Sequence, residues 1–171
     1  REHEVYALDI NSEAIRLTKE RCKNHKNLTA MVGDATSRLP FDDNYFDGVS
    51  SMLVLWAIKN PRNYLLEHGR VLRSGGILVV SGPGIESKDP VELILEKFRE
   101  DLEAQGFFPQ IEKSWEEFVC CNRENVSRTI ENWFSNDEIK NILEKTGYSV
   151  LSIKPNPVYF GLGYIVTAKR D

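Results

Sequence analysis

The sequence of 171 residues is long enough for one domain, or for one domain with a small additional lobe. Hydrophobic residues make up 41% and charged residues 28% of it, which excludes a disordered, collagen-like or coiled-coil chain. The net charge of −4, from 22 basic and 26 acidic residues, favours neither a nucleic acid nor an anionic membrane as a partner.

The three cysteines, Cys22, Cys120 and Cys121, have neither the number nor the spacing for a disulfide framework or a zinc site. They predict reduced thiols, no bound metal and a cytoplasmic protein. The longest apolar run, residues 52–58, is far shorter than the ~20 residues that a membrane span needs. No signal peptide is visible, so no membrane partner is predicted.

The first half of the sequence alternates predicted strands with predicted helices. This spacing predicts right-handed βαβ units and a parallel sheet. One helix follows a cap at Asn11 or Ser12, and another begins at Pro61 and is predicted to stop at Ser74-Gly75-Gly76. The predicted strands are residues 5–10, 28–32, 46–52 and 77–81, the first of them buried.

Residues 85–133 interrupt this rhythm. Asp89 with Pro90 is a strong helix start, and Gly106 can end that helix. Several short helices are predicted over residues 107–133, where aromatic residues lie among many charges. We therefore expect a helical lobe on the sheet rather than a strand of it.

The last segment predicts a helix followed by two strands. Ser135 and Glu138 have the spacing of a capping box, with Phe134 and Ile139 as a hydrophobic staple. Strands at 148–153 and 164–168 are joined by a loop too short for a helical crossover, so they should pair antiparallel. The expected organisation is a core of residues 1–84, a lid of residues 85–133 and a completing segment of residues 134–171.

Four motifs follow one another along the chain: a strand ending in Asp9, Gly33-Asp34-Ala35 after the next strand, Leu39-Pro40-Phe41 before Phe46-Asp47, and Val71-Leu72 before Gly75-Gly76. With the closing antiparallel pair, this series resembles the class I S-adenosylmethionine-dependent methyltransferases, most closely the small-molecule enzymes of quinone biosynthesis. The resemblance covers most of residues 5–82 and 134–168.

The resemblance implies a three-layer, Rossmann-like α/β fold with an antiparallel C-terminal strand and a helical lid after the fourth visible strand. It implies S-adenosylmethionine as cofactor, S-adenosylhomocysteine as product, and in-line methyl transfer to a small-molecule acceptor. Positioning of the two reactants would be the main contribution of the protein.

Candidate cofactor residues follow the first two strands. Asp9 lies at the carboxyl end of a strand, where its carboxylate can accept hydrogen bonds from a ribose diol. Ile10 could pack on an adenine face, or could equally belong to the core. The resemblance implies that Asp34 meets the adenine amino group and that the amide of Ala35 meets a ring nitrogen. The alternatives are that Asp9 caps the next helix and that Asp34 only forms a turn.

Further candidates lie at the end of the third strand and in the lid. Ser51, Met52 and Leu53 should lie beside the methionine part of the cofactor. Trp56 could wall the acceptor pocket or only pack under the lid. Aromatic residues that could line the acceptor site, or simply form the core of the lid, are Phe107, Phe108, Trp115 and Trp133.

The sequence also departs from the family. The glycine-rich loop after the family's first strand is absent, with that strand and its helix, so we expect a fragment whose sheet lacks a central strand. Two alternatives stay open: a piece of a nicotinamide-dependent dehydrogenase with Asp9 as its ribose acid, and a non-catalytic binding module. His25 and His68 are expected to be solvated and packed, respectively, and no catalytic residue is assigned.

Overall fold

The structure is a computed structural model that describes residues 3–84, 90–129 and 131–171. The chain divides into two compact units, Arg1–Phe41 and Asp42–Asp171, which are described separately below. Among the described residues no helix is long and apolar enough to cross a membrane.

The first unit is a single βαβ element. Strand β1 (Val5–Asp9) pairs in parallel with β2 (Leu28–Val32), and helix α1 (Ser12–Arg21) connects them. The side chain of Asn11 accepts hydrogen bonds from two amides of the first turn, which confirms Asn11 as the cap. Ile15, Ala30 and Leu39 form a small buried core.

Strand β1 is less buried than the sequence predicts. Its three central residues are half-buried and both ends are exposed. The physical reason is that, within the described residues, β1 pairs with β2 along one edge and has no strand on the other.

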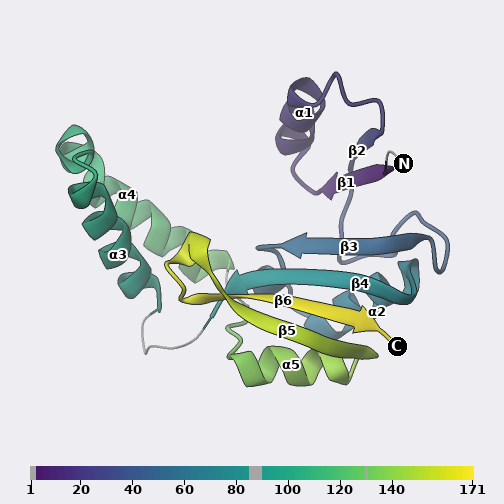
Figure 1. The fold of residues 1–171 in the computed structure, drawn as a ribbon. Coiled ribbons are helices and arrows are strands. Elements are labelled where there is room, and N and C mark those ends of the chain that lie inside the picture. Colours follow the sequence, from purple (N-terminus) through teal and green to yellow (C-terminus); the bar gives the residue numbers. More distant parts are fainter. Residues whose placement is uncertain (1–2, 85–89, 130) are drawn as a thin grey trace. The chain divides into compact units, whose positions relative to one another are not determined.

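The second unit contains a four-stranded sheet in the order β3-β4-β6-β5 (Figure 1). Strands β3 (Phe46–Met52) and β4 (Leu72–Pro83) are parallel. Strands β5 (Tyr148–Asn156) and β6 (Gly163–Arg170) are antiparallel to each other, and β6 is antiparallel to β4. The predicted parallel sheet with a closing antiparallel pair is therefore confirmed, and the fold is α/β and Rossmann-like.

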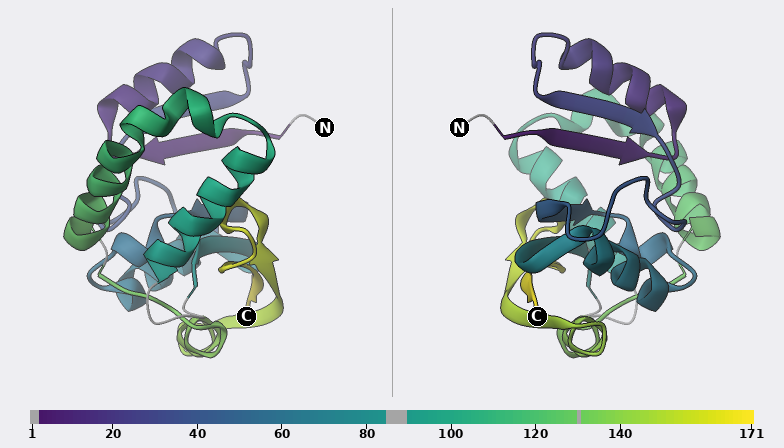
Figure 2. Two further views of the ribbon diagram at one scale, coloured as in Figure 1. Left: turned by 90° about the vertical axis from the view of Figure 1, so that its left-hand side faces the viewer. Right: turned by 90° about the vertical axis from the view of Figure 1, so that its right-hand side faces the viewer.

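Helices α2 (Pro61–Val71) and α5 (Asn136–Glu144) lie on the same side of this sheet (Figures 1 and 2). The phenol of Tyr148 in β5 donates a hydrogen bond of 2.9 Å to the carbonyl of Leu65 in α2, which fixes α2 against the sheet. The predicted capping box at Ser135 and Glu138 is present. Short helical turns η1 (Leu55–Ala57) and η2 (Pro157–Tyr159) complete the connections.

One predicted boundary is wrong. Helix α2 ends at Val71, and residues 74–76 lie inside β4 rather than forming a helix stop. The chain is already extended at Leu72, whose carbonyl accepts a hydrogen bond from the guanidinium of Arg170. Gly75, at φ 74°, instead accommodates an irregularity in the pairing of β3 with β4.

Residues 90–129 form a hairpin of two helices, α3 (Pro90–Ala104) and α4 (Phe108–Thr129), at one end of the sheet (Figures 1 and 2). The prediction of several short helices over residues 107–133 is wrong, because α4 runs unbroken for 22 residues. No glycine or proline follows Pro109 in α4, and buried residues recur at helical spacing. The predicted start at Asp89 lies outside the described residues.

Candidate functional site

The carboxyl ends of β1 and β2 bring Asp9 and Asp34 to the same edge of the first unit. Asp9 pairs with Val32, and the amide of Gly33 continues the ladder by donating a hydrogen bond of 3.0 Å to the carbonyl of Asp9. Asp34 is the next residue. Its turn therefore starts where the strand pair ends.

The carboxylate of Asp9 is held on one side only. Its Oδ1 accepts a hydrogen bond of 2.8 Å from the backbone amide of Asn11. Its Oδ2 has no hydrogen-bond partner among the described residues. The helix cap itself is Asn11. Asp9 is thus oriented by its own chain, yet retains an oxygen for a ligand hydroxyl.

Asp34 is engaged more fully by its turn. Its Oδ1 accepts from the amide and the hydroxyl of Thr36, at 2.8 and 2.7 Å, and its Oδ2 accepts from the Ser37 hydroxyl at 3.1 Å. These hydrogen bonds, chiefly those from Thr36, lower the pKa of Asp34 below its ordinary value. Asp34 therefore does form a turn, and the hydrogen bonds of that turn favour the charged form of its carboxylate.

Apolar residues adjoin the two aspartates in the chain or in the strand pairing. Ile10 is 72% exposed, Val32 is also exposed and Ala35 is half-buried. Ile10 therefore does not belong to the core of the first unit. A Cβ at Gly33 would lie 2.9 Å from Leu8 Cδ1, so the turn packs closely on the side chain of Leu8 in β1.

The ends of β3 and β4 form a second candidate region, in the second unit. The Ser51 hydroxyl is buried and lies 2.8 Å from the Tyr64 hydroxyl of α2, so it faces the interior. Met52 is 50% and Leu53 38% exposed. Leu53 has a φ of 59°, a left-handed conformation that is unfavourable for leucine and typical of functional positions.

Trp56, in η1, forms hydrogen bonds that link this region to the segment after α4. Its indole N–H donates a hydrogen bond of 2.9 Å to the carbonyl of Leu53. Its own carbonyl accepts from the amides of Glu131 and Asn132, both at 3.0 Å. The Asn132 side chain also donates to the carbonyl of Ile58. The segment that returns from α4 is thus bonded directly to η1.

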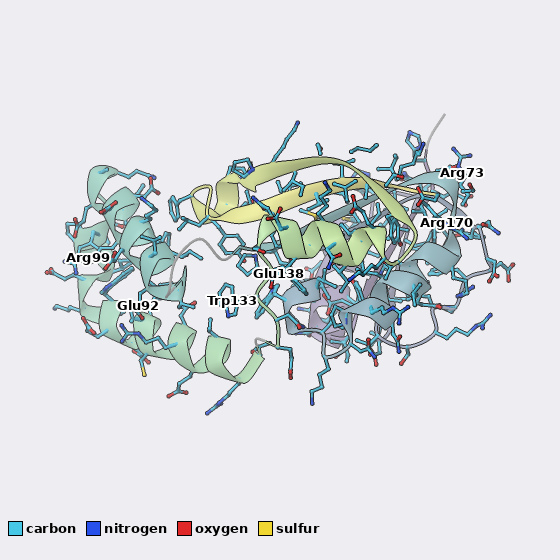
Figure 3. The ribbon with its side chains drawn as sticks, turned by 90° about the horizontal axis from the view of Figure 1, so that it is seen from below. Arg73, Glu92, Arg99, Trp133, Glu138 and Arg170 are labelled. Atoms are coloured by element: carbon cyan, nitrogen blue, oxygen red, sulfur yellow. The ribbon has the colours of Figure 1, made fainter. Side chains whose placement is uncertain are left out.

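The aromatic residues of the lid are in two environments. Phe108 and Trp115 are buried in the hairpin's own core with Leu95 and Val119, whereas Phe107 is exposed at the hairpin tip. Trp133 is half-buried in the segment between α4 and α5, at the base of the hairpin (Figure 3). Of the four, Trp133 and Phe107 remain at least partly exposed.

A pair of arginine hydrogen bonds joins the two lid helices. The guanidinium of Arg123 in α4 contacts both carboxylate oxygens of Glu92 in α3, at 2.6 and 2.7 Å. This contact lowers the pKa of Glu92. The hairpin therefore has an internal clamp in addition to its apolar core.

Sequence reasoning missed a buried polar cluster behind the second region. His68 lies against the ring of Tyr64, with centroids 4.0 Å apart, and its Nδ1 is 2.8 Å from the Tyr64 carbonyl. Burial lowers the pKa of His68. The spacing of Tyr64 and His68 predicts that both pack against the core from one face of α2. It does not predict the hydrogen bond between the hydroxyls of Tyr64 and Ser51. No group of residues in the described part of the chain could hold a metal ion.

Comparison with known proteins agrees with this architecture. Residues 1–80 match a family described as a methyltransferase domain. A demethylmenaquinone methyltransferase of Tropheryma whipplei is 28% identical over 150 residues, which are 88% of this chain and 59% of that protein. The chain thus spans about three fifths of the length of this relative.

Solved structures extend the likeness to nearly the whole chain. A SAM-dependent methyltransferase from Methanosarcina mazei superposes with a TM-score of 0.62 at 22% identity, covering 96% of this chain and 81% of that one. The cyclase SpnF superposes with a TM-score of 0.66 at 14% identity, covering 98% and 66%. The sequence matches and the fold thus make the chain similar to S-adenosylmethionine-dependent methyltransferases.

Proposed function

We propose that this chain is the larger part of an enzyme that transfers a methyl group from S-adenosylmethionine to a small molecule. The cofactor's sulfonium supplies an activated methyl group, so the protein needs mainly to align two reactants away from water. The observation that carries the proposal is the edge formed by Asp9 and Asp34, which matches the chemistry of a nucleoside.

The residues at this edge fit the adenosyl group. The free oxygen of Asp9 can accept from a ribose hydroxyl, and the charged Asp34 can accept from an amino group. The exposed side chain of Ile10 offers an apolar surface for a purine ring. The backbone amide of Ala35 stands next in the chain as a donor to a ring nitrogen.

The acceptor is proposed to be a quinone-like ring, because the relative of 28% identity is named for demethylmenaquinone. Trp56 and Trp133 would supply apolar contact for such a ring in the second unit, beside Met52 and Leu53, which we propose as contacts of the methionine part of the cofactor. Residues 85–133 would act as its lid, inserted between a core of residues 1–84 and the segment 134–171. The independent core of the hairpin supports that division. A cytoplasmic location belongs to the same proposal, and the three free cysteines agree with it.

Calorimetric titration with S-adenosylhomocysteine and with NADH, in parallel, tests the proposal. The chain should bind S-adenosylhomocysteine, and Asp9→Asn should weaken that binding about tenfold or more, the range for a charge-assisted hydrogen bond. Glu4→Gln is the matched control, because Glu4 is an exposed acid immediately before the first residue of the same strand. Binding of NADH but not of S-adenosylhomocysteine would favour the dehydrogenase alternative, and binding of neither would favour a non-catalytic module.

A further inference from the structure

Two buried hydroxyl groups of the second unit have no hydrogen-bond partner among the described residues. They are Ser81 Oγ in β4 and the Tyr164 hydroxyl in β6, on side chains of residues that are 0% and 1% exposed. Native structures rarely leave buried hydroxyls unpaired, because such a group has lost its bonds to water. Each therefore needs a physical explanation.

The two hydroxyls lie on opposite faces of the sheet. Ser81 is opposite Ile165 in the antiparallel register, whereas Tyr164 is opposite the following residue, Gly82. Successive residues of a strand point to opposite faces, so Ser81 and Tyr164 cannot share a partner. The two residues thus form a natural comparison: the same group, equally buried, on two faces of one strand pair.

Packing explains Tyr164. Its ring lies over Gly82, where a Cβ would come within 2.6 Å of the Tyr164 hydroxyl. It shares its face with the buried residues Val80 and Val166. Burial raises the pKa of Tyr164, so the phenol stays neutral. The large apolar ring accounts for its position even though the hydroxyl is unpaired.

No such packing argument applies to Ser81, whose side chain is small. In the parallel register it is directly beside Met52, which is half-exposed. Its carbonyl accepts a hydrogen bond of 3.0 Å from the amide of Leu53, the residue in a left-handed conformation. An unpaired hydroxyl, a strained backbone and an exposed apolar side chain therefore meet where two parallel strands end, which is where open α/β sheets bind ligands.

We propose that Ser81 is a specificity-determining residue, whose hydroxyl forms a hydrogen bond with a ring hydroxyl or carbonyl oxygen of the methyl acceptor. This proposal rests on the proposed function. The residues that flank Ser81 on its own and neighbouring strands are uncharged, namely Met52, Leu53, Gly82 and Ile165, which suits a neutral ring rather than an anion. The flexible thioether of Met52 moves aside as the ring enters.

A site with a buried hydroxyl discriminates strongly between ligands with and without a polar partner. The test uses 4-fluorophenol and 4-fluorotoluene, which differ in one hydroxyl against one methyl group, with binding followed by fluorine NMR of the ligand. The wild-type chain should prefer 4-fluorophenol about three- to tenfold, the range for one neutral hydrogen bond. Ser81→Ala should abolish this preference, and Tyr164→Phe should leave it intact.

Thermal unfolding of both variants completes the design. Each substitution removes a hydroxyl that makes no hydrogen bond within the described chain, so neither should lower the midpoint. A preference retained by Ser81→Ala, a wild type without preference, or a midpoint lowered only by Ser81→Ala would overturn the assignment. Titration with S-adenosylhomocysteine separates the two proposals: its failure to bind the wild type would contradict the methyltransferase function, whereas the fluorine experiment addresses Ser81 alone.

Discussion

The two pairs of parallel strands, β1–β2 and β3–β4, differ in the side chains at their carboxyl ends. The first pair ends in Asp9 and Asp34, exposed carboxylates oriented by amides and hydroxyls of their own turns. The second ends in buried serine hydroxyls beside exposed aliphatic side chains. Equivalent positions in successive βαβ elements thus carry exposed carboxylates in one place, and buried hydroxyls with exposed apolar side chains in the other.

The two regions also differ in what supports them. Strands β1 and β2 form a two-stranded sheet with one helix, and the buried apolar residues of that unit are few. Strands β3 and β4 belong to a four-stranded sheet backed by α2 and α5. Because small sheets are marginally stable on their own, the second region should dominate the measured stability of the chain.

The largest expected effect is in the core of the second region. Leu65 is fully buried in α2, whereas its neighbour Leu66 is 45% exposed. Leu65→Ala should lower the free energy of unfolding by about 2–5 kcal/mol through lost burial and a cavity. Leu66→Ala should change it by about 0.5 kcal/mol or less. Urea unfolding measures both, and equal effects would show that α2 does not pack on the sheet as described.

A smaller effect is expected at the serine that faces α2. Ser51→Ala leaves the buried Tyr64 hydroxyl without its partner and should lower the free energy of unfolding by about 1–3 kcal/mol. Ser50→Ala, on the exposed opposite face of β3, is the matched control. The double variant Ser51→Ala, Tyr64→Phe should recover most of the loss, and failure to do so would mean that the hydroxyl pair does not contribute.

These elements show how far the sequence predicts this molecule. The cap at Asn11 or Ser12, the capping box at Ser135 and the antiparallel closing pair follow from local patterns, which are confirmed, with Asn11 as the cap. The extent of β4 was not predictable from Gly75-Gly76, because it depends on Arg170, 98 residues away from Leu72. The buried hydroxyl of Ser81 gave no local signal at all, since burial of a serine is decided by neighbours on other strands.

A pH dependence should distinguish the two regions further. Burial lowers the pKa of His68, so the unfolded chain takes up a proton below its ordinary pKa of about 6.5 while the folded chain resists it. The free energy of unfolding is therefore highest, with respect to His68, above about pH 6.5, and it falls as the pH drops below that value. Urea unfolding of the wild type and of His68→Gln at pH 8 and pH 5.5 tests this, and an equal loss in both would contradict it.

The smallest effect is expected at Asp34, in the first region. Its pKa is lowered by Thr36, so its contribution is present above the ordinary carboxyl pKa of about 4 and falls as the pH drops through the lowered value. The side chain is exposed, which keeps the effect small. Amide hydrogen exchange of residues 34–37 should quicken in that acid range, and Thr36→Val should remove much of the change. Exchange that is independent of pH, after correction for intrinsic rates, would contradict the hydrogen bonds.

The central claim is that the Asp9 carboxylate holds the ribose of the cofactor. A thermodynamic cycle tests it most directly, using calorimetric titration of the wild type and Asp9→Asn with S-adenosylhomocysteine and its 2′,3′-dideoxy analogue. We predict that either change alone weakens binding about tenfold or more, and that both together weaken it little further, because they remove the same hydrogen bonds. Full additivity of the two losses would show that Asp9 does not contact the ribose hydroxyls.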